Sequence, residues 1–436
     1  MERKTRIAKP IETILKRITK ISCESPKLEF VGLIQHFNKE NLIGCFHELD
    51  GKKAVGIDKV SKEEYAVNLE SNIEDLICRM KALKYYPAPV REVKIPKGNG
   101  KYRHLGISNI EDKIIQRMYA KILNAIYEPH FIETSYGFRP GRNCHDAIKA
   151  IHKVLDSLRE GVIIDVDLSN FFGTINHRKL IQILELRIKD KTFIRYIVRM
   201  LRAGVLANGE LSMSDTGTPQ GSIVSPILSN IFAHYCLDLW ITHEIPKFLQ
   251  EEARLVRYAD DFVIVTNKAD APRILKALRG RLERFSLEIN DEKTKVKTFS
   301  KSEFEKTGRQ VPLDFLGFTF YIDKSLKGKT IVKVKTASQT LSKKLKDVSE
   351  WIKKDRCRYR LKELWKTFQS KMRGHIQYYG VSFNFKGMNA FVWKSKEIFF
   401  KWINRRSQRK SFSWEKFSLF EKRNPLPAIR IVQRLF

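Results

Sequence analysis

The sequence predicts an α+β fold in which short strands carry the candidate site and helices surround them. Residues 255–265 and 89–107 each contain two apolar or alternating runs on either side of a short polar turn, a pattern typical of β-hairpins. The apolar run at residues 161–166 predicts a buried strand. Apolar residues at helical spacing in residues 1–50 and 112–127 predict helices in those segments.

Composition indicates the kind of partner. The chain has 436 residues, long enough for two or three domains, and 42% of its residues are hydrophobic, as expected for a folded protein. Its formal net charge of +33 predicts a polyanionic partner that binds in a salt-sensitive way. A membrane surface is the alternative, but no apolar run approaches the length of a spanning helix. Nucleic acid is therefore the favoured partner.

The six cysteines are scattered and form no CxxC pair, which predicts a reduced intracellular chain without a zinc site. Residues 1–20 are basic but lack the apolar core of a secretory signal, so an organellar transit peptide is the alternative at this end. No Walker A loop and no HExxH motif is present, which leaves ATPase and zinc-hydrolase functions without support.

Carboxylates gather at two predicted strand ends. Asp260 and Asp261 lie at the tip of the 255–265 hairpin, and Asp165 and Asp167 come at the end of the 161–166 strand. Neighbouring like charges repel, and a divalent cation relieves that repulsion, whereas a solvated turn is the alternative for an isolated Asp pair. If the strand lies beside the hairpin, three carboxylates converge and can hold two Mg²⁺ ions roughly 3.5–4 Å apart, with Mn²⁺ as an alternative metal.

Three sequence blocks then point to a family. Residues 258–261 are YADD, residues 166–172 are VDLSNFF followed by Ile175-Asn176-His177, and residues 217–231 begin with GTPQGS. In this order and spacing they resemble the bacterial group II intron-encoded reverse transcriptases and maturases, without the HNH endonuclease extension that many members carry. The similarity covers residues 52–427.

The resemblance implies a right-hand polymerase with fingers, a ferredoxin-like palm and a basic all-helical thumb or maturase domain. We expect an N-terminal extension and fingers in residues 1–110, a fingers and palm core in residues 111–321, and the thumb in residues 322–436. The last segment holds 30 Lys and Arg against 8 Asp and Glu, interleaved with aromatic residues. We expect most of those aromatics to pack a helical bundle and the cations to form an RNA-binding face.

The resemblance also implies the roles of individual residues. Asp167, rather than Asp165, is expected to bind the metals with Asp260 and Asp261, and Leu168 to lend its backbone carbonyl. The expected nucleotide-binding residues are Lys97, Arg103, Phe172, Gln220 and Lys293, with Phe172 crowding a ribose 2′-hydroxyl and Lys293 near the leaving pyrophosphate. The expected template-binding residues are Arg139, Arg142 and Gly221. Gly173 departs from the family pattern, in which Asp is common, but that Asp is not a metal ligand.

The implied function is RNA-directed DNA synthesis from dNTPs on an RNA template, extending a DNA or RNA primer in the cytoplasm of a bacterium. The template is expected to be group II intron RNA, which the chain would also bind as a maturase. Two alternatives stay open: a maturase acting only as an RNA-binding splicing cofactor, and a domesticated reverse transcriptase in host defence or repair.

Overall fold

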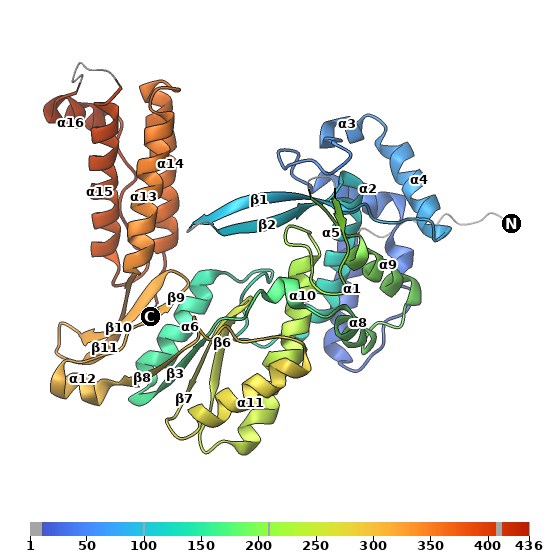
Figure 1. The fold of residues 1–436 in the computed structure, drawn as a ribbon, viewed down its shortest axis with the longest axis horizontal. Coiled ribbons are helices and arrows are strands. Elements are labelled where there is room, and N and C mark those ends of the chain that lie inside the picture. Colours follow the sequence, from blue (N-terminus) through green and yellow to red (C-terminus); the bar gives the residue numbers. More distant parts are fainter. Residues whose placement is uncertain (1–10, 99–100, 208–209, 407–411, 436) are drawn as a thin grey trace. The chain divides into compact units, whose positions relative to one another are not determined.

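The computed structural model describes residues 11–98, 101–207, 210–406 and 412–435. Its mixture of helices and strands confirms the α+β class (Figure 1). The chain divides into two compact units, each built from several segments. The first unit comprises Met1–Asn143, Val166–Ile264 and Ala269–Lys295, and the second comprises Cys144–Asp165, Val265–Lys268 and Val296–Phe436.

The helical part of the first unit is centred on α5 (Ile110–Tyr127), whose buried residues lie on nearly every side of the helix. A helix that is apolar almost all round belongs in a core, and α1, α2 and α10 pack against it. The longer helices of this unit are α1 (Ile11–Glu24), α2 (Lys39–His47), α4 (Leu69–Lys81), α8 (His177–Glu185), α9 (Lys191–Arg202), α10 (Ser225–Ala233) and α11 (Ala271–Arg284). The shorter ones are α3 (Lys62–Ala66) and α7 (Phe171–Thr174).

A four-stranded sheet of the first unit contains the predicted hairpin of residues 89–107. Its strands are β1 (Val90–Gly98), β2 (Lys101–Ile107), β4 (Val205–Ala207) and β5 (Glu210–Ser212), in the order β2-β1-β4-β5. β1 and β2 pair antiparallel, and the register sets Ile95 opposite Arg103. The hairpin prediction is therefore confirmed. The side chain of Lys97 lies outside the described part of the structure.

A second four-stranded sheet carries the carboxylates. Its strands are β3 (Glu160–Val166), β6 (Arg254–Tyr258), β7 (Asp261–Thr266) and β8 (Lys295–Ser300), in the order β6-β7-β3-β8. The division between the two units runs through β3, β7 and β8. The predicted strand at residues 161–166 and the predicted hairpin at residues 255–265 are both present, so Asp167 follows β3 and Asp261 begins β7.

The second unit joins a three-stranded sheet to long helices. The sheet has the order β11-β10-β9, from β9 (Leu313–Phe315), β10 (Phe318–Lys324) and β11 (Thr330–Thr336). The helices are α6 (Cys144–Ser157), α12 (Lys301–Thr307), α13 (Ser338–Asp355), α14 (Leu361–Tyr379), α15 (Phe385–Ile403) and α16 (Trp414–Arg423). Trp365, Phe368 and Phe399 are buried and contact one another, as expected for a helical bundle. No helix among the described residues is long and apolar enough to span a membrane.

Candidate active site

The turn between β6 and β7 presents the adjacent aspartates. Its two residues are Ala259 and Asp260, and Ala259 has a φ of 59°, a left-handed conformation that costs energy for a residue with a side chain. One contact from within the hairpin and one from outside it accompany this turn. The Arg257 guanidinium donates to the Ala259 carbonyl at 2.9 Å, and the backbone of Gly137 lies directly against Ala259.

Asp167 is held by a segment that follows it by more than 120 residues. Its backbone carbonyl accepts from the Asn290 amide at 2.8 Å, and its amide donates to the Thr294 hydroxyl at 3.3 Å. The Lys293 ammonium contacts both Asp167 carboxylate oxygens, at 3.1 and 3.2 Å. A cation therefore lies at the carboxylate that we expect to bind metal.

One cavity of about 490 Å³ in the first unit collects most of the predicted site. Predicted residues that line it are Asp167, Leu168, Asp260, Asp261, Arg103, Phe172, Gln220, Gly221 and Lys293. Three carboxylates, two cations and an aromatic ring therefore face one space.

The donor atoms of this cavity suit a hard divalent cation, because carboxylate and carbonyl oxygens are its preferred ligands. Within the described ranges, no three Asp, Glu, His or Cys side chains are close enough to form a ready-made metal cluster. The Lys293 ammonium pairs with the Asp167 carboxylate and so offsets part of the negative charge that the carboxylates bring to this cavity. The residues fit the metal chemically without being preassembled around it.

The Gln220 turn is fastened to the segment after β3. The Thr218 amide donates to the Phe172 carbonyl at 2.7 Å, and the Gly217 amide donates to the Ile175 carbonyl at 2.8 Å. The ring of His177 contacts the Gly217 carbonyl at 2.6 Å, and burial lowers the pKa of this histidine. The Gln220 turn and helix α7, which carries Phe172, therefore form one wall of this cavity.

The backbone conformation and close surroundings of position 221 require glycine. Its φ is 108°, and an added Cβ would lie 2.6 Å from the Gly106 carbonyl oxygen, so a side chain does not fit. The Gly106 amide donates to the Gln220 carbonyl at 2.6 Å, which ties the turn to β2 of the β1–β2 hairpin. The predicted close approach of backbone at Gly221 is to β2, and the template contact stays a prediction.

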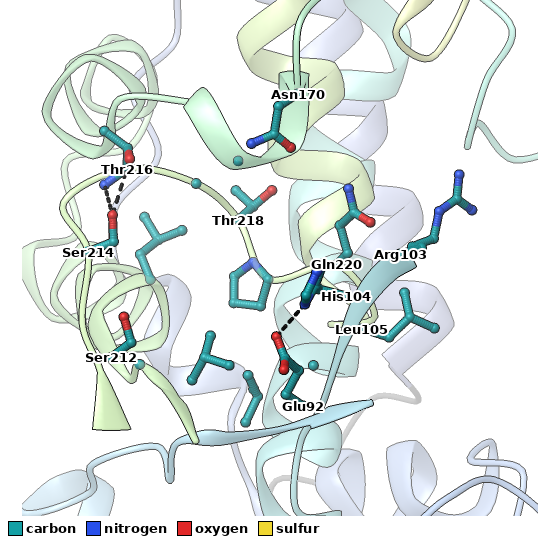
Figure 2. A pocket seen from close by; sticks show the side chains of 18 of the residues that line it. Glu92, Arg103, His104, Leu105, Asn170, Ser212, Ser214, Thr216, Thr218 and Gln220 are labelled. Carbon is teal, nitrogen blue, oxygen red and sulfur yellow. Dashed lines mark hydrogen bonds and ion pairs between the residues drawn. The ribbon is translucent and has the colours of Figure 1, made fainter. Parts of the chain in front are cut away.

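A second cavity, of about 390 Å³, adjoins the first and shares Arg103, Leu105, Asn170 and Gln220 with it. Figure 2 shows Glu92 and His104 hydrogen-bonded on one side and the hydroxyls of Ser212, Ser214 and Thr216 on the other. Gly173 also lines this cavity. A Cβ there would lie 2.3 Å from the side-chain nitrogen Nδ2 of Asn170, so the Asn170 side chain occupies the space that a side chain at position 173 would need.

The two template arginines differ. The Arg139 side chain is only 3% exposed and donates to the Ile132 and Ser135 carbonyls, each at 2.7 Å, and to the Glu128 carboxylate. These bonds engage its donors within its own loop and favour a structural role, and the expected template contact of Arg139 stays a prediction that RNA binding by a variant can test. Arg142 lies nearer the surface and pairs with Glu133 at 2.7 Å, and its template contact stays a prediction.

Sequence reasoning missed a buried polar network beside the β6–β7 turn. Arg257 is 1% exposed and Asp238 is fully buried, and the two form a bidentate pair at 2.7 and 2.6 Å. Burial alone would raise the pKa of Asp238, but Arg257 and His234 hold it below its ordinary value. A signal existed: an arginine inside the apolar run that precedes YADD is out of place in a buried strand unless it is paired.

Comparisons with known proteins identify the family of this chain. Residues 95–320 match the family model described as "Reverse transcriptase (RNA-dependent DNA polymerase)". The chain is 28% identical over 469 residues to the group II intron-encoded protein LtrA of Lactococcus lactis subsp. cremoris, covering 88% of this chain and 76% of that protein. It is 33% identical over 281 residues to protein YkfC of Escherichia coli, covering 56% of this chain and 73% of that protein. It is also 41% identical over 162 residues to an uncharacterized 91 kDa protein in the cob intron of Schizosaccharomyces pombe, covering 37% of this chain and 20% of that protein. The chain therefore belongs to the reverse transcriptase family of RNA-directed DNA polymerases, in the class of group II intron-encoded reverse transcriptases and maturases.

Proposed function

We propose that this reverse transcriptase extends a DNA or RNA primer along an RNA template in the cavity lined by Asp167, Asp260 and Asp261. One observation carries the proposal: carboxylates from two separate segments share a single cavity with Arg103 and the Gln220–Gly221 turn. Phosphoryl transfer needs a bound triphosphate, charge neutralisation and an aligned primer hydroxyl, and this set of groups can meet those needs.

We assign Asp167, Asp260 and the Leu168 carbonyl to two Mg²⁺ ions, with Asp261 completing the site and Mn²⁺ as the alternative metal. Such ions lower the pKa of the attacking hydroxyl and neutralise charge on the leaving group. Lys293 supplies a further cation beside Asp167, and we assign it to the departing pyrophosphate.

The incoming dNTP is assigned to the remaining walls of the cavity. Arg103 offers a fork of donors for phosphate oxygens, Lys97 is assigned the same role, and Gln220 offers an amide to the sugar or base. Phe172 is half-buried, with its ring in edge contact with Phe171 and Phe138 at 5.6 and 6.1 Å. A ring fixed by neighbouring rings is suited to excluding a ribose 2′-hydroxyl, which would select dNTPs.

We infer a right-hand arrangement, with an N-terminal extension and fingers in residues 1–110, a fingers and palm core in residues 111–321, and a thumb in residues 322–436. The last segment holds 30 Lys and Arg against 8 Asp and Glu, and this excess of positive charge supports a role in binding RNA. The relative LtrA is named as encoded by a group II intron. We therefore propose group II intron RNA as template and as a maturase partner, in the cytoplasm of a bacterium.

Primer extension on an RNA template with Mg²⁺ and dNTPs tests the proposal, comparing the wild type with Asp260→Ala. We expect at least about a hundredfold loss of extension by this variant, because its carboxylate acts in the transition state, while RNA affinity stays within about twofold. Asp75→Ala, which removes an exposed carboxylate paired with Arg79 on α4, is the matched control and should keep full activity. Substantial synthesis by Asp260→Ala would refute the assignment. Inactive wild type that binds RNA tightly would favour a maturase acting only as a splicing cofactor.

A further inference from the structure

The catalytic turn has an anchor that pairing between β6 and β7 does not supply. Arg257, at the end of β6, reaches three groups at once: both Asp238 carboxylate oxygens, the Asn230 side-chain oxygen at 3.2 Å and the Ala259 carbonyl at 2.9 Å. The last contact holds the turn residue that separates Tyr258 from Asp260. A planar guanidinium can bridge several acceptors in fixed directions, which an ammonium cannot do.

The network extends to the loop that contains Thr134, Tyr136 and Gly137, called here the covering loop because it packs against the turn. The Asn230 side-chain nitrogen Nδ2 donates to the Gly137 carbonyl at 2.7 Å, and the Gly137 backbone lies against Ala259. The Arg257 carbonyl accepts from the Tyr136 amide at 2.9 Å, and the Arg257 amide donates to the Thr134 carbonyl at 2.9 Å. Arg257 therefore links β6, α10, the covering loop and the turn.

Stability alone does not explain this ion pair. Burying two charges costs desolvation energy that the pair recovers only in part, so well-packed apolar residues can serve a core equally well. Asp238 also lies at the end of a π-helical segment, His234–Asp238, a helix form that is frequent at functional sites. What apolar residues cannot supply is a donor fixed on the Ala259 carbonyl.

We propose that Arg257 is a positioning residue for polymerisation: oriented by Asp238 and Asn230, it holds the Ala259 carbonyl and thereby sets the direction in which Asp260 and Asp261 point. The inference rests on the proposed roles of these two aspartates. Because it concerns carboxylate placement, it has a consequence for cation binding that can be measured without polymerisation.

The test uses full-length protein, the Asp260→Ala variant and four further variants. Arg257→Lys keeps the charge but not the fork, and Arg257→Met leaves Asp238 buried without its partner. The double variant Arg257→Met/Asp238→Leu removes both charges, which relieves the desolvation penalty of the single change. Arg187→Met is the matched control, because Arg187 is also buried in the first unit, bonds the Ile126 carbonyl and packs over Phe30. The measurements are Mn²⁺ binding by electron paramagnetic resonance, the kcat and KM for dNTP, RNA affinity and the thermal unfolding midpoint.

We expect Arg257→Lys to weaken Mn²⁺ binding and to lower kcat, each by about tenfold or more, as for other residues that orient metal ligands. RNA affinity and the KM for dNTP should change little. The double variant should recover thermal stability relative to Arg257→Met but not kcat or Mn²⁺ affinity, and Arg187→Met should keep both.

Wild-type Mn²⁺ affinity and kcat in Arg257→Lys, or their recovery together with stability in the double variant, would overturn the proposal and leave Arg257 a structural residue. If the wild type fails to polymerise while its Mn²⁺ binding still depends on Arg257 and Asp260, the proposed function fails, and the inference stands only for the placement of the carboxylates that bind the cation. If the wild type polymerises and only Asp260→Ala is impaired, the inference fails alone.

Discussion

At the scale of single residues, surroundings decide what a side chain does. Arg103 and Arg139 are chemically identical, yet Arg103 is exposed and lines the carboxylate cavity, whereas Arg139 is buried among carbonyl acceptors. The first side chain has exposed donors, and the second has its donors engaged within its own loop. The same residue type therefore supports two different expectations upon substitution.

We expect Arg139→Met to lower the free energy of unfolding by about 2–4 kcal/mol, because it leaves the partly buried Glu128 and two carbonyls without their donor. RNA affinity per folded molecule should stay within about twofold. Urea denaturation and RNA binding by filter retention measure the two quantities, with Arg103→Met as the comparison that should spare stability. A selective loss of template affinity in Arg139→Met would support the template role.

His375 gives the second unit a pH dependence. Its ring is stacked on Phe391 at 3.6 Å, and neither ring nitrogen has a hydrogen-bond partner within the described part of the chain. Burial and the charge of Lys344 lower its pKa from 6.5 to about 3. Below pH 6.5 the His375 ring is protonated in the unfolded chain but stays neutral in the folded chain. The contribution of this residue to the free energy of unfolding is therefore fully present above pH 6.5 and is lost as the pH falls towards 3.

The unfolding free energy of the wild type should therefore decrease between pH 6.5 and 4.5 by up to about 1.4 kcal/mol per pH unit from this residue. His375→Phe, which keeps the stacking and removes the titrating group, should flatten that part of the profile. Denaturant melts across the pH series measure the effect, with His47→Gln on the surface of α2 as control. An unchanged slope in His375→Phe would show that other groups cause the acid sensitivity.

At the scale of elements, the site is a junction of turns. The loop at residues 135–142 is bonded to β6 through Tyr136 and Arg257, and the Gln220 turn is bonded to β2 through Gly106. Each turn lacks the regular pairing of a strand or helix, so its shape depends on the neighbour that it contacts. Close packing at Gly137 is the tightest of these junctions, because an added Cβ would lie 2.3 Å from the Ala259 amide nitrogen.

Gly137→Ala should therefore displace the catalytic turn and reduce primer extension by about tenfold or more, since small misplacements of reacting groups are costly. RNA affinity should be nearly unchanged. Gly280→Ala is the control, because the added methyl on α11 meets open space and alanine favours a helix. Wild-type extension by Gly137→Ala would show that the loop yields without moving the carboxylates.

At the scale of the whole molecule, we expect positive charge to supply most of the attraction for RNA. The formal net charge is +33, and about two thirds of it comes from residues 322–436. In the second unit, exposed Lys401 and Arg405 line a hollow together with Phe400 and Trp414, whose rings are stacked 3.9 Å apart. Cations beside partly exposed aromatics suit single-stranded RNA, which offers both phosphates and bases.

The double variant Lys401→Gln/Arg405→Gln should reduce the steepness of log affinity against log salt concentration by about 1–2. Each phosphate that a Lys or Arg contacts releases about one counterion on binding, so losing two cations reduces the number of counterions released. Fluorescence anisotropy with labelled RNA between 50 and 400 mM KCl, roughly the range over which such binding weakens, measures the slope. Lys276→Gln on α11 is the control for loss of a single exposed charge. An unaltered slope would place the RNA contacts elsewhere.

The sequence by itself determined the class of the fold and the positions of the strands and hairpins. It also showed that carboxylates lie at two strand ends, and its net charge predicts a polyanionic partner. These properties follow from periodicity, turn residues and charge, which are written locally along the chain. Only the tertiary structure decided that Lys293 pairs with Asp167, that Arg139 turns inward, and that Arg257 joins Asp238 to the Ala259 carbonyl. Those contacts depend on how distant segments pack, and a side chain's type does not reveal whether its donors will meet solvent, a ligand or a buried carbonyl.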